Sequence, residues 1–209
     1  MITVVDYGMG NLRSVYNALN LLGAEVCVSD KPEDILSADR LVLPGVGAFG
    51  RAMDNLRQRG LISVLNEKVL HQKTPILAIC LGMQLLAEEG YEHGHFEGLG
   101  WIRGTVRHFE LNQLPVPHVG WNEIMMRAER PLFKGLASSN REFYFVHSYH
   151  LTTDDQSIIA ATADYGYEFV CAVHHENIFG TQFHPEKSQN NGLTLLRNFM
   201  QWEVQPALC

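Results

Sequence analysis

The sequence Pro75–Gln84, PILAICLGMQ, places a cysteine between an apolar strand and a helix. The run Ile76–Ile79 is too short for a core helix, and its continuous apolar character is typical of a buried parallel strand. After the cysteine, apolar residues recur at helical spacing at Leu81, Leu85 and Leu86. This stretch therefore predicts a strand that turns directly into a helix.

Cys80 stands at the turn, with the small residues Ala78 and Gly82 two positions before and after it. Small neighbours are typical of a nucleophile elbow, because strand and helix pack too closely there for bulky side chains. A cysteine so placed lies at a helix N-terminus, where the helix dipole favours thiolate over thiol. A free cysteine is more often an inert core residue, but the elbow pattern favours a reactive one.

Strands and helices alternate through the N-terminal part of the chain, in the pattern of a parallel sheet covered by helices on both faces. Strands are expected at 2–5, 25–28, 41–43 and 76–79, and helices at 12–22, 31–38 and 51–71, the last broken at Gly60. The C-terminal part is predicted to consist mainly of strands, at 101–109, 142–147, 158–163, 169–174 and 178–183, before a closing helix at 193–202. We therefore expect a single α/β domain over residues 1–209, with an open, mostly parallel sheet, flanking helices and antiparallel additions.

The composition argues against several classes of protein. With a net charge of −7, the chain has no basic stripe to neutralise phosphates, so nucleic acid is not an expected partner. No apolar run is long enough to span a membrane, and the N-terminus lacks the basic region of a signal peptide. The four cysteines, Cys27, Cys80, Cys171 and Cys209, have neither metal-type spacing nor the density of a disulfide framework. We expect reduced thiols in a cytoplasmic protein.

A cysteine nucleophile needs a base, and the base needs a group that orients it. The chain has ten histidines, but one segment, GTQFHPEKS at 180–188, places His184 at the end of an apolar strand with Glu186 two residues later. In extended backbone these two side chains share a face, and Pro185 keeps His184 out of the helical region. The alternative is a surface turn with two solvated polar groups, which the presence of Cys80 disfavours.

The other histidines do not suggest a metal centre. A metal site is less expected, because His93, His95, His174 and His175 show no zinc-like spacing with cysteine. No cofactor is expected either.

A thioester mechanism also requires hydrogen-bond donors for the tetrahedral oxyanion. One expected donor is the backbone amide of Leu81, directly after the nucleophile. A second must come from a loop at the carboxyl end of the sheet, where open α/β folds bind their ligands. Pro44–Gly47 is the best candidate, because it follows a buried strand and its glycines expose backbone amides. The loop lacks the features of a phosphate or dinucleotide site, so nucleotide binding is not indicated.

Several motifs together resemble a known family. PGVG at 44–47, AICLGMQ at 78–84 and FHPE at 183–186 have the order and spacing of class I (triad) glutamine amidotransferases. The resemblance is strongest to the glutaminase subunits of imidazole glycerol phosphate synthases. It rests on PHVGWN at 117–122, YFVHSY at 144–149 and Met83, where sister families often carry histidine. The resemblance covers nearly the whole chain and implies a flavodoxin-like fold. Ala78 departs from the glycine common at that elbow position but is still small.

The resemblance implies a role for each candidate residue. Cys80 attacks the side-chain amide carbon of L-glutamine, His184 moves the proton to the departing ammonia, and Glu186 orients His184. The implied oxyanion donors lie at Val46, Gly47 and Leu81. The implied contacts to the amino-acid end of glutamine are Gly45, Gln84 and the backbone around His147, Ser148 and Tyr149.

The resemblance also implies a partner. In this family the ammonia passes to a separate (β/α)-barrel cyclase subunit, which builds it into an imidazole in histidine biosynthesis and releases an aminoimidazole carboxamide ribotide. A heterodimer is expected, and at 209 residues the chain has little beyond the glutaminase itself. The residues expected to face the cyclase are Met9, Asn11, Met125 and Lys187.

Three other functions are compatible with parts of the sequence. A paralogue could deliver ammonia to a sugar-modifying synthetase by the same chemistry, and only the identity of the partner separates it. An inactive, binding-only regulatory subunit is disfavoured by the intact set of Cys80, His184 and Glu186. A stand-alone cysteine peptidase with a related elbow is disfavoured by the PHVGWN segment.

Overall fold

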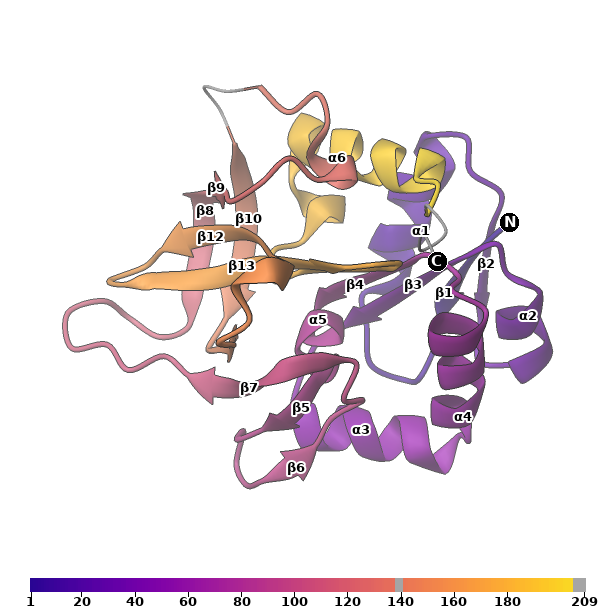
Figure 1. Cartoon of the computed structure of the whole chain (residues 1–209), viewed down its shortest axis with the longest axis horizontal. Helices are drawn as coiled ribbons and strands as arrows, with labels where there is room; N and C mark the ends of the chain where they lie inside the picture. Colours follow the sequence, from indigo (N-terminus) through magenta and orange to yellow (C-terminus); the bar gives the residue numbers. More distant parts are fainter. Residues whose placement is uncertain (138–140, 205–209) are drawn as a thin grey trace.

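The computed structural model describes residues 1–137 and 141–204. Within them, five parallel strands form the centre of the fold in the order β2-β1-β3-β4-β14 (Figure 1). Their bounds are β1 (Ile2–Val5), β2 (Val26–Ser29), β3 (Arg40–Gly45), β4 (Ile76–Cys80) and β14 (Ile178–Thr181). Because the strands are parallel, β3, β4 and β14 bring their carboxyl ends to one edge of the sheet, where open α/β folds bind ligands.

Further strands extend this sheet beyond β14 in the order β13-β11-β7-β5-β6, and all of these pairs are antiparallel except β5 with β7. Off this path, β12 pairs with β13, and β9 pairs with β12. A separate two-stranded ribbon of β8 and β10 lies beside it. The bounds are β5 (Ala87–Gly90), β6 (Phe96–Glu97), β7 (Ile102–His108), β8 (His118–Glu123), β9 (Met125–Met126), β10 (Glu142–His147), β11 (Tyr149–Thr152), β12 (Ile159–Asp164) and β13 (Glu168–His175).

Helices cover both faces of the parallel strands. Figure 1 shows α1 and α6 on one side and α3 and α4 on the other. The helices are α1 (Leu12–Leu21), α2 (Pro32–Ser37), α3 (Phe49–Gln58), α4 (Leu61–Asn66), α5 (Leu81–Leu85) and α6 (Gln189–Gln201). Shorter helical segments are η1 (Glu67–His71), η2 (Pro131–Phe133), η3 (Gln156–Ile158) and η4 (Pro185–Lys187). No helix in the described ranges is both long and apolar enough to cross a bilayer.

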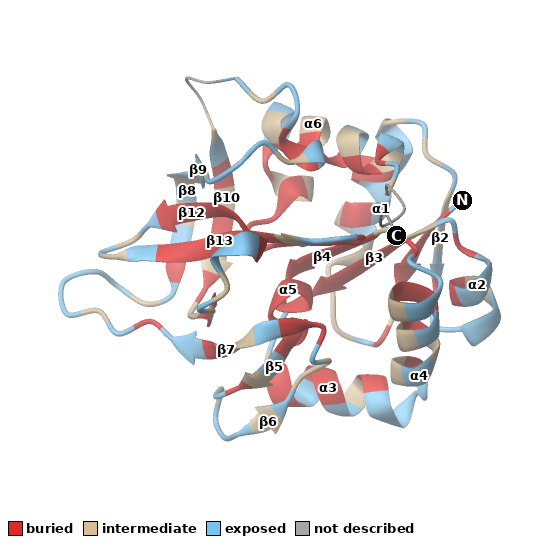
Figure 2. Ribbon diagram, viewed as in Figure 1, coloured by how far each residue is buried: buried red, intermediate tan, exposed pale blue. Residues whose placement is uncertain are grey.

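Two apolar cores lie on opposite faces of the sheet. In β4, Ile76 and Ala78 face the core formed with α3 and α4, whereas Leu77 and Ile79 face the core formed with α1 and α6. All four side chains are at most 1% exposed, so the central strand is buried on both faces (Figure 2). The continuous apolar run that predicts this strand therefore reflects two separate cores, since successive side chains point to opposite faces.

The expected α/β architecture is confirmed, but several element boundaries differ. The helix after Cys80 ends at Leu85, and the next residues form β5 instead of further helical turns. The backbone carbonyls of Leu85 and Leu86 accept hydrogen bonds from the amides of Leu99 and Trp101, which replaces the helical pattern. Five strands, β5, β6, β8, β9 and β11, were not predicted from the sequence, and α6 begins four residues before its predicted start.

Candidate active site

Cys80 occupies a strained corner between β4 and α5. Its backbone has a φ of 55° and a ψ of −110°, an unfavourable conformation for a residue other than glycine. A Cβ atom on Gly82 would overlap the carbonyl oxygen of Leu43 on the neighbouring strand. The close approach of α5 to β3 therefore requires glycine at position 82, as the elbow pattern predicts.

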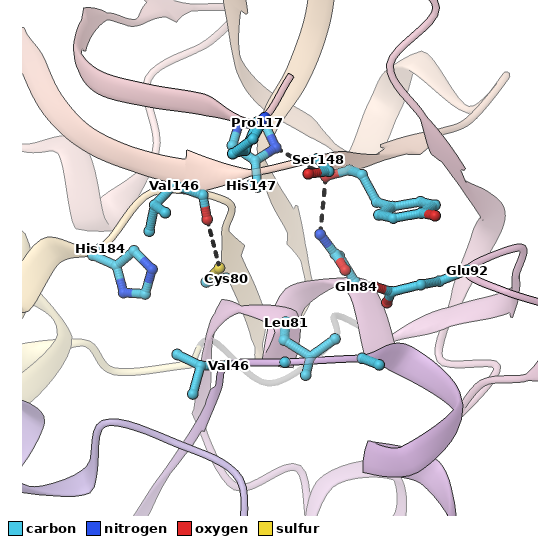
Figure 3. Close-up of a pocket in the computed structure, with 13 residues that line it drawn as sticks. Val46, Cys80, Leu81, Gln84, Glu92, Pro117, Val146, His147, Ser148 and His184 are labelled. Atoms are coloured by element: carbon cyan, nitrogen blue, oxygen red, sulfur yellow. Dashed lines mark hydrogen bonds between the residues drawn. The ribbon is translucent and has the colours of Figure 1, made fainter. Parts of the chain in front are cut away.

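Cys80 lines an open pocket of about 440 Å³ (Figure 3). The pocket has the size of a small-molecule site. Its lining includes most of the residues that the sequence analysis singled out: Val46, Gly47, Cys80, Leu81, Gln84, His147, Ser148, Tyr149 and His184. Four further lining residues, Ala48, Glu92, Pro117 and Val146, were not anticipated.

Two weak polar contacts hold the sulfur. The thiol lies 4.0 Å from the carbonyl oxygen of Val146, and the Nε2 atom of Gln182 lies 3.7 Å from Sγ and donates to it. Gln182 is fully buried, so its amide is a fixed dipole directed at the sulfur.

His184 and Glu186 form a buried pair beside this pocket. The Nδ1 atom of His184 lies 2.8 Å from Oε1 of Glu186, and the side chains are 2% and 1% exposed. Because a carboxylate accepts hydrogen bonds and does not donate them, the Nδ1 atom of His184 carries a proton. Nε2 is buried and has no hydrogen-bond partner within the described part of the chain.

The charges around His184 determine its protonation. Burial lowers the pKa of the ring, but the sulfur of Cys80 and the carboxylate of Glu186 outweigh burial and raise that pKa to about 10. The sulfur and the carboxylate therefore both favour the protonated form of the ring.

The geometry of the His184–Glu186 pair differs from the expected extended strand. β14 ends at Thr181, and Glu186 lies in the short helix η4. The chain leaves the sheet because the amide of His184 donates to the carbonyl of Tyr144 on β10. Ser188 secures the turn: its hydroxyl donates to the carbonyl of His184 at 2.6 Å and accepts from the amide of Tyr144 at 3.0 Å.

The glycine-rich loop after β3 lies next to the elbow. Gly45 is buried, and a Cβ atom there would lie 2.8 Å from Cβ of Leu81, so a glycine allows β3 and α5 to pack closely; its contact with glutamine stays a prediction. Gly47 has a φ of 102°, and a Cβ atom there would lie 2.7 Å from the terminal methyl of Met9. Val46 and Gly47 line the pocket. Leu81 is the first residue of α5, where backbone amides have no intrahelical acceptor.

Gln84 and Glu92 place polar groups at the far end of the pocket from His184 (Figure 3). The Nε2 atom of Gln84 donates to the carbonyl of Tyr149 at 3.0 Å and to Oε1 of Gln182 at 3.1 Å, which directs Oε1 of Gln84 elsewhere. Glu92 accepts from the amide of Phe49 through one oxygen, at 2.7 Å. Glu92 follows β5 in a segment without a recognisable motif, so nothing in the sequence singled it out.

The expected partner-facing residues are spread over several elements. Met9 touches the loop at Gly47, and Asn11 directly precedes α1. The ammonium of Lys187 lies 5.8 Å from the ring centroid of Tyr144. Met125, on the short strand β9, is 43% exposed. Their role at an interface stays a prediction.

Among the described residues, no group of three or more histidine, cysteine or acidic side chains is arranged to hold a metal ion. Cys27, Cys80 and Cys171 are free thiols. Cys209 lies outside the described residues.

The site combines a strained cysteine elbow, a buried histidine–carboxylate pair and an adjoining pocket. These features are typical of an acyl-transfer enzyme that works through a thioester. The chain belongs to the class I glutamine amidotransferase family, whose sequence model matches residues 3–202.

Named relatives are similar over nearly their whole length. The imidazole glycerol phosphate synthase subunit HisH 1 of Campylobacter jejuni (strain RM1221) is 50% identical, and the match covers 96% of this chain and 100% of that protein. The subunit of the same name from Methanococcus maripaludis is 47% identical, with 96% and 99% covered. The HisH subunit of Acinetobacter baylyi is 44% identical, with 97% and 98% covered.

Solved structures share the fold at much lower identity. PurLQS from Thermotoga maritima superposes with a TM-score of 0.73 at 18% identity, covering 96% of this chain and 97% of that one. The glutaminase domain of Trypanosoma brucei CTPS gives a TM-score of 0.65, also at 18% identity, covering 100% and 97%. These similarities confirm the expected fold class.

Proposed function

We propose that this chain is the glutaminase subunit of an imidazole glycerol phosphate synthase, hydrolysing L-glutamine and delivering the ammonia to a cyclase in histidine biosynthesis. The buried His184–Glu186 pair beside Cys80 carries the chemical part of the proposal, because acyl transfer needs these three groups together. The HisH relatives, identical at about half of all positions, support the biosynthetic part. The proposed compartment is the cytoplasm, where the nucleophile stays reduced.

The protonation of the triad determines the order of steps. The thiolate of Cys80 attacks the side-chain amide carbon of glutamine, and the carbonyl π electrons move to the oxygen. The imidazolium of His184 gives its Nε2 proton to the amide nitrogen as the C–N bond breaks, which releases ammonia and leaves a thioester. Neutral His184 then takes a proton from water, whose oxygen attacks the thioester carbon. Collapse of the second oxyanion frees glutamate and restores the thiolate and the imidazolium.

Two tetrahedral oxyanions form in this cycle, and both need donors. The amide of Leu81 and the amides of the loop at Val46 and Gly47 are the proposed donors, because both segments line the pocket at Cys80. Gly47 adopts a positive φ that other residues disfavour, which supports a specialised backbone conformation in this loop.

The amino-acid end of glutamine carries an ammonium and a carboxylate. Glu92 is the one carboxylate among the residues that line the pocket, and its Oε2 is already bonded to the amide of Phe49. We assign the α-ammonium to Glu92 and to Oε1 of Gln84, and the α-carboxylate to the backbone at Ser148 and Tyr149. This orientation points the side-chain amide toward Cys80.

Ammonia needs an acceptor, so the proposed unit is a heterodimer with a (β/α)-barrel cyclase that covers Met9, Asn11, Met125 and Lys187. Met9 supports this arrangement because it touches Gly47, which connects the proposed interface with the oxyanion loop. A partner that moves Met9 therefore has a direct mechanical route to the active site.

The test mixes the purified chain, L-glutamine and candidate partners, and measures glutamate formed against ammonia incorporated. We expect a poor glutaminase alone, stimulation by the cyclase carrying its own ligand, and no stimulation by a sugar-modifying synthetase. Cys80→Ala should remove glutamate production while the heterodimer still assembles. Full activity without any partner, or stimulation by the synthetase alone, would contradict the proposal.

A further inference from the structure

A network of hydrogen bonds connects β8, β10 and β11 at the wall of the pocket to which His147 contributes. The Nδ2 atom of Asn122 lies 3.3 Å from Nε2 of His118, whose Nδ1 lies 3.0 Å from Nε2 of His147. The Nδ1 atom of His147 in turn lies 2.8 Å from the carbonyl oxygen of Tyr149. The two histidines face each other across the β8–β10 ribbon and are only 3% and 6% exposed.

The groups at both ends of this hydrogen-bond network determine which atom donates in each bond. The carbonyl of Tyr149 can only accept, so Nδ1 of His147 carries a proton and its Nε2 accepts. At the other end, Asn122 also donates through Nδ2 to the carbonyl of Asp164 at 2.8 Å, which fixes the orientation of its amide. Nε2 of His118 therefore accepts, and its Nδ1 donates to His147. Every bond is satisfied only when both rings are neutral with the proton on Nδ1.

The hydrogen-bond network continues from Tyr149 to the sulfur of Cys80. The Tyr149 carbonyl accepts a second hydrogen bond from Nε2 of Gln84, which also donates to Oε1 of Gln182. Nε2 of Gln182 then donates to the sulfur of Cys80 at 3.7 Å. A single network thus joins the histidine pair, the proposed amino-acid end of the pocket and the reactive sulfur.

Building on the proposed function, we propose that His118 and His147 are positioning residues, a neutral pair in the Nδ1–H form that fixes the Tyr149 carbonyl and thereby orients Gln84 for glutamine. Both ring nitrogens of His147 are engaged within the protein, so its ring acts on the substrate through Tyr149 and not directly.

The surroundings of the pair hold the rings and exclude charge. His118 lies between the rings of Phe145 and Tyr165, with centroids 4.9 and 4.0 Å away, and Phe109 packs against His147 at 5.1 Å. Burial lowers the pKa of His118 to about 4 and that of His147 to about 3. Protonation of either ring would set two N–H groups against each other or against Asn122.

The first test observes the tautomers directly in the wild-type protein bound to its cyclase. Long-range proton–nitrogen correlation spectra of histidine-labelled protein separate the Nδ1–H form, the Nε2–H form and the imidazolium. We expect the Nδ1–H pattern for both residues at pH 7, with His118→Phe and His147→Phe used to assign the signals. An Nε2–H or imidazolium pattern for either residue would overturn the proposal, whatever the enzyme's activity.

The second test measures glutaminase kinetics of the same complex. His118→Phe keeps an aromatic ring between Phe145 and Tyr165 but removes the donor to His147, so the KM for glutamine should rise about tenfold with kcat changed less. The matched control is His150→Phe. His150 is equally buried and also packs on Phe109, but it bonds Tyr167 and Leu151 outside the network.

Equal KM values for His118→Phe and His150→Phe would contradict a positioning role. Failure of the proposed function is distinguishable, because a wild-type complex that does not hydrolyse glutamine would still give the tautomer spectrum. Restoration of a lower KM by His118→Asn, whose amide can again donate toward His147, would support positioning over a packing role.

Discussion

The Nδ1 atom of His184 lies 2.8 Å from Oε1 of Glu186, and the pair is almost completely removed from water. A charge pair in such surroundings is stable only when each member has its counterpart, because neither can be solvated. The second oxygen of Glu186 has no partner in the described part of the chain, so His184 is the main stabilising contact of this carboxylate.

Replacing the carboxylate should therefore affect the reaction through His184. Glu186→Gln keeps the size of the side chain and an oxygen that accepts from Nδ1, but it removes the negative charge. We expect kcat to fall about 10²- to 10⁴-fold. The pKa of His184 should also fall, because the carboxylate is one of the groups that raise it. Steady-state kinetics and a pH titration of the ring signals measure both effects.

Glu142→Gln is the matched control for this substitution. Glu142 begins β10 and is exposed, so its replacement removes one charge without contacting His184. A Glu186→Gln variant that kept the turnover of this control would show that the carboxylate has no part in the reaction.

Glu92→Gln tests the proposed ammonium site. The variant can still accept from the Phe49 amide but loses the charge that faces the pocket. We expect the KM for glutamine to rise about 10- to 100-fold, since a hydrogen bond between charged groups contributes about 1.5–3 kcal/mol. Glu89→Gln, on the adjacent strand outside the pocket lining, is the control. An unchanged KM in Glu92→Gln would assign the ammonium elsewhere.

Gly82→Ala tests the packing of the elbow. The new methyl group would overlap the carbonyl oxygen of Leu43, and this backbone atom cannot move without disturbing β3. We expect a loss of about 1–3 kcal/mol in the free energy of unfolding, measured by urea titration. Gly23→Asn is the control, because its positive φ suits asparagine and nothing lies within 4 Å of the added carbon. Equal stability of the two variants would refute this account of the elbow.

The elbow and the central sheet were predictable because their signals are local. A buried parallel strand must be apolar at every position, and a tight strand–helix corner must have small residues at fixed offsets from Cys80. The pairing of His184 with Glu186 was also anticipated, but on an extended backbone. The actual turn depends on the hydroxyl of Ser188 and the backbone of Tyr144, which is 40 positions away from His184 and is brought near by the fold.

Residues whose position depends on distant strands could not be anticipated. Glu92 enters the pocket because the β5–β6 segment folds back beside α3, and no periodicity in its sequence signals that contact. Similarly, His118 and His147 are 29 residues apart and meet only through the β8–β10 pairing, of which the sequence analysis expected one strand. Strand pairing sets which side chains face each other, and sequence spacing alone does not specify it.

Histidines whose pKa is lowered by burial of the ring also predict how stability depends on pH. Burial lowers the pKa of His118, His147 and His174 to values of about 4, 3 and 4. An unfolded histidine has a pKa of about 6.5, so between pH 6.5 and 5 the unfolded chain takes up protons that the folded chain does not. The free energy of unfolding should therefore decrease as the pH is lowered from 6.5 to 5, with a limiting slope of about 1.4 kcal/mol per pH unit for each histidine.

Urea titrations between pH 5 and 6.5 measure this slope above the range in which ordinary carboxyl groups titrate. His174→Phe should reduce it by the share of one histidine, because phenylalanine fits against Phe179 and Trp202 but binds no proton. The replacement also removes the hydrogen bond from Nε2 of His174 to the carbonyl oxygen of Glu176, which lowers the stability at every pH and leaves the slope to report the lost proton site. A His174→Phe variant with the wild-type slope would show that this ring is protonated equally in the folded and unfolded states.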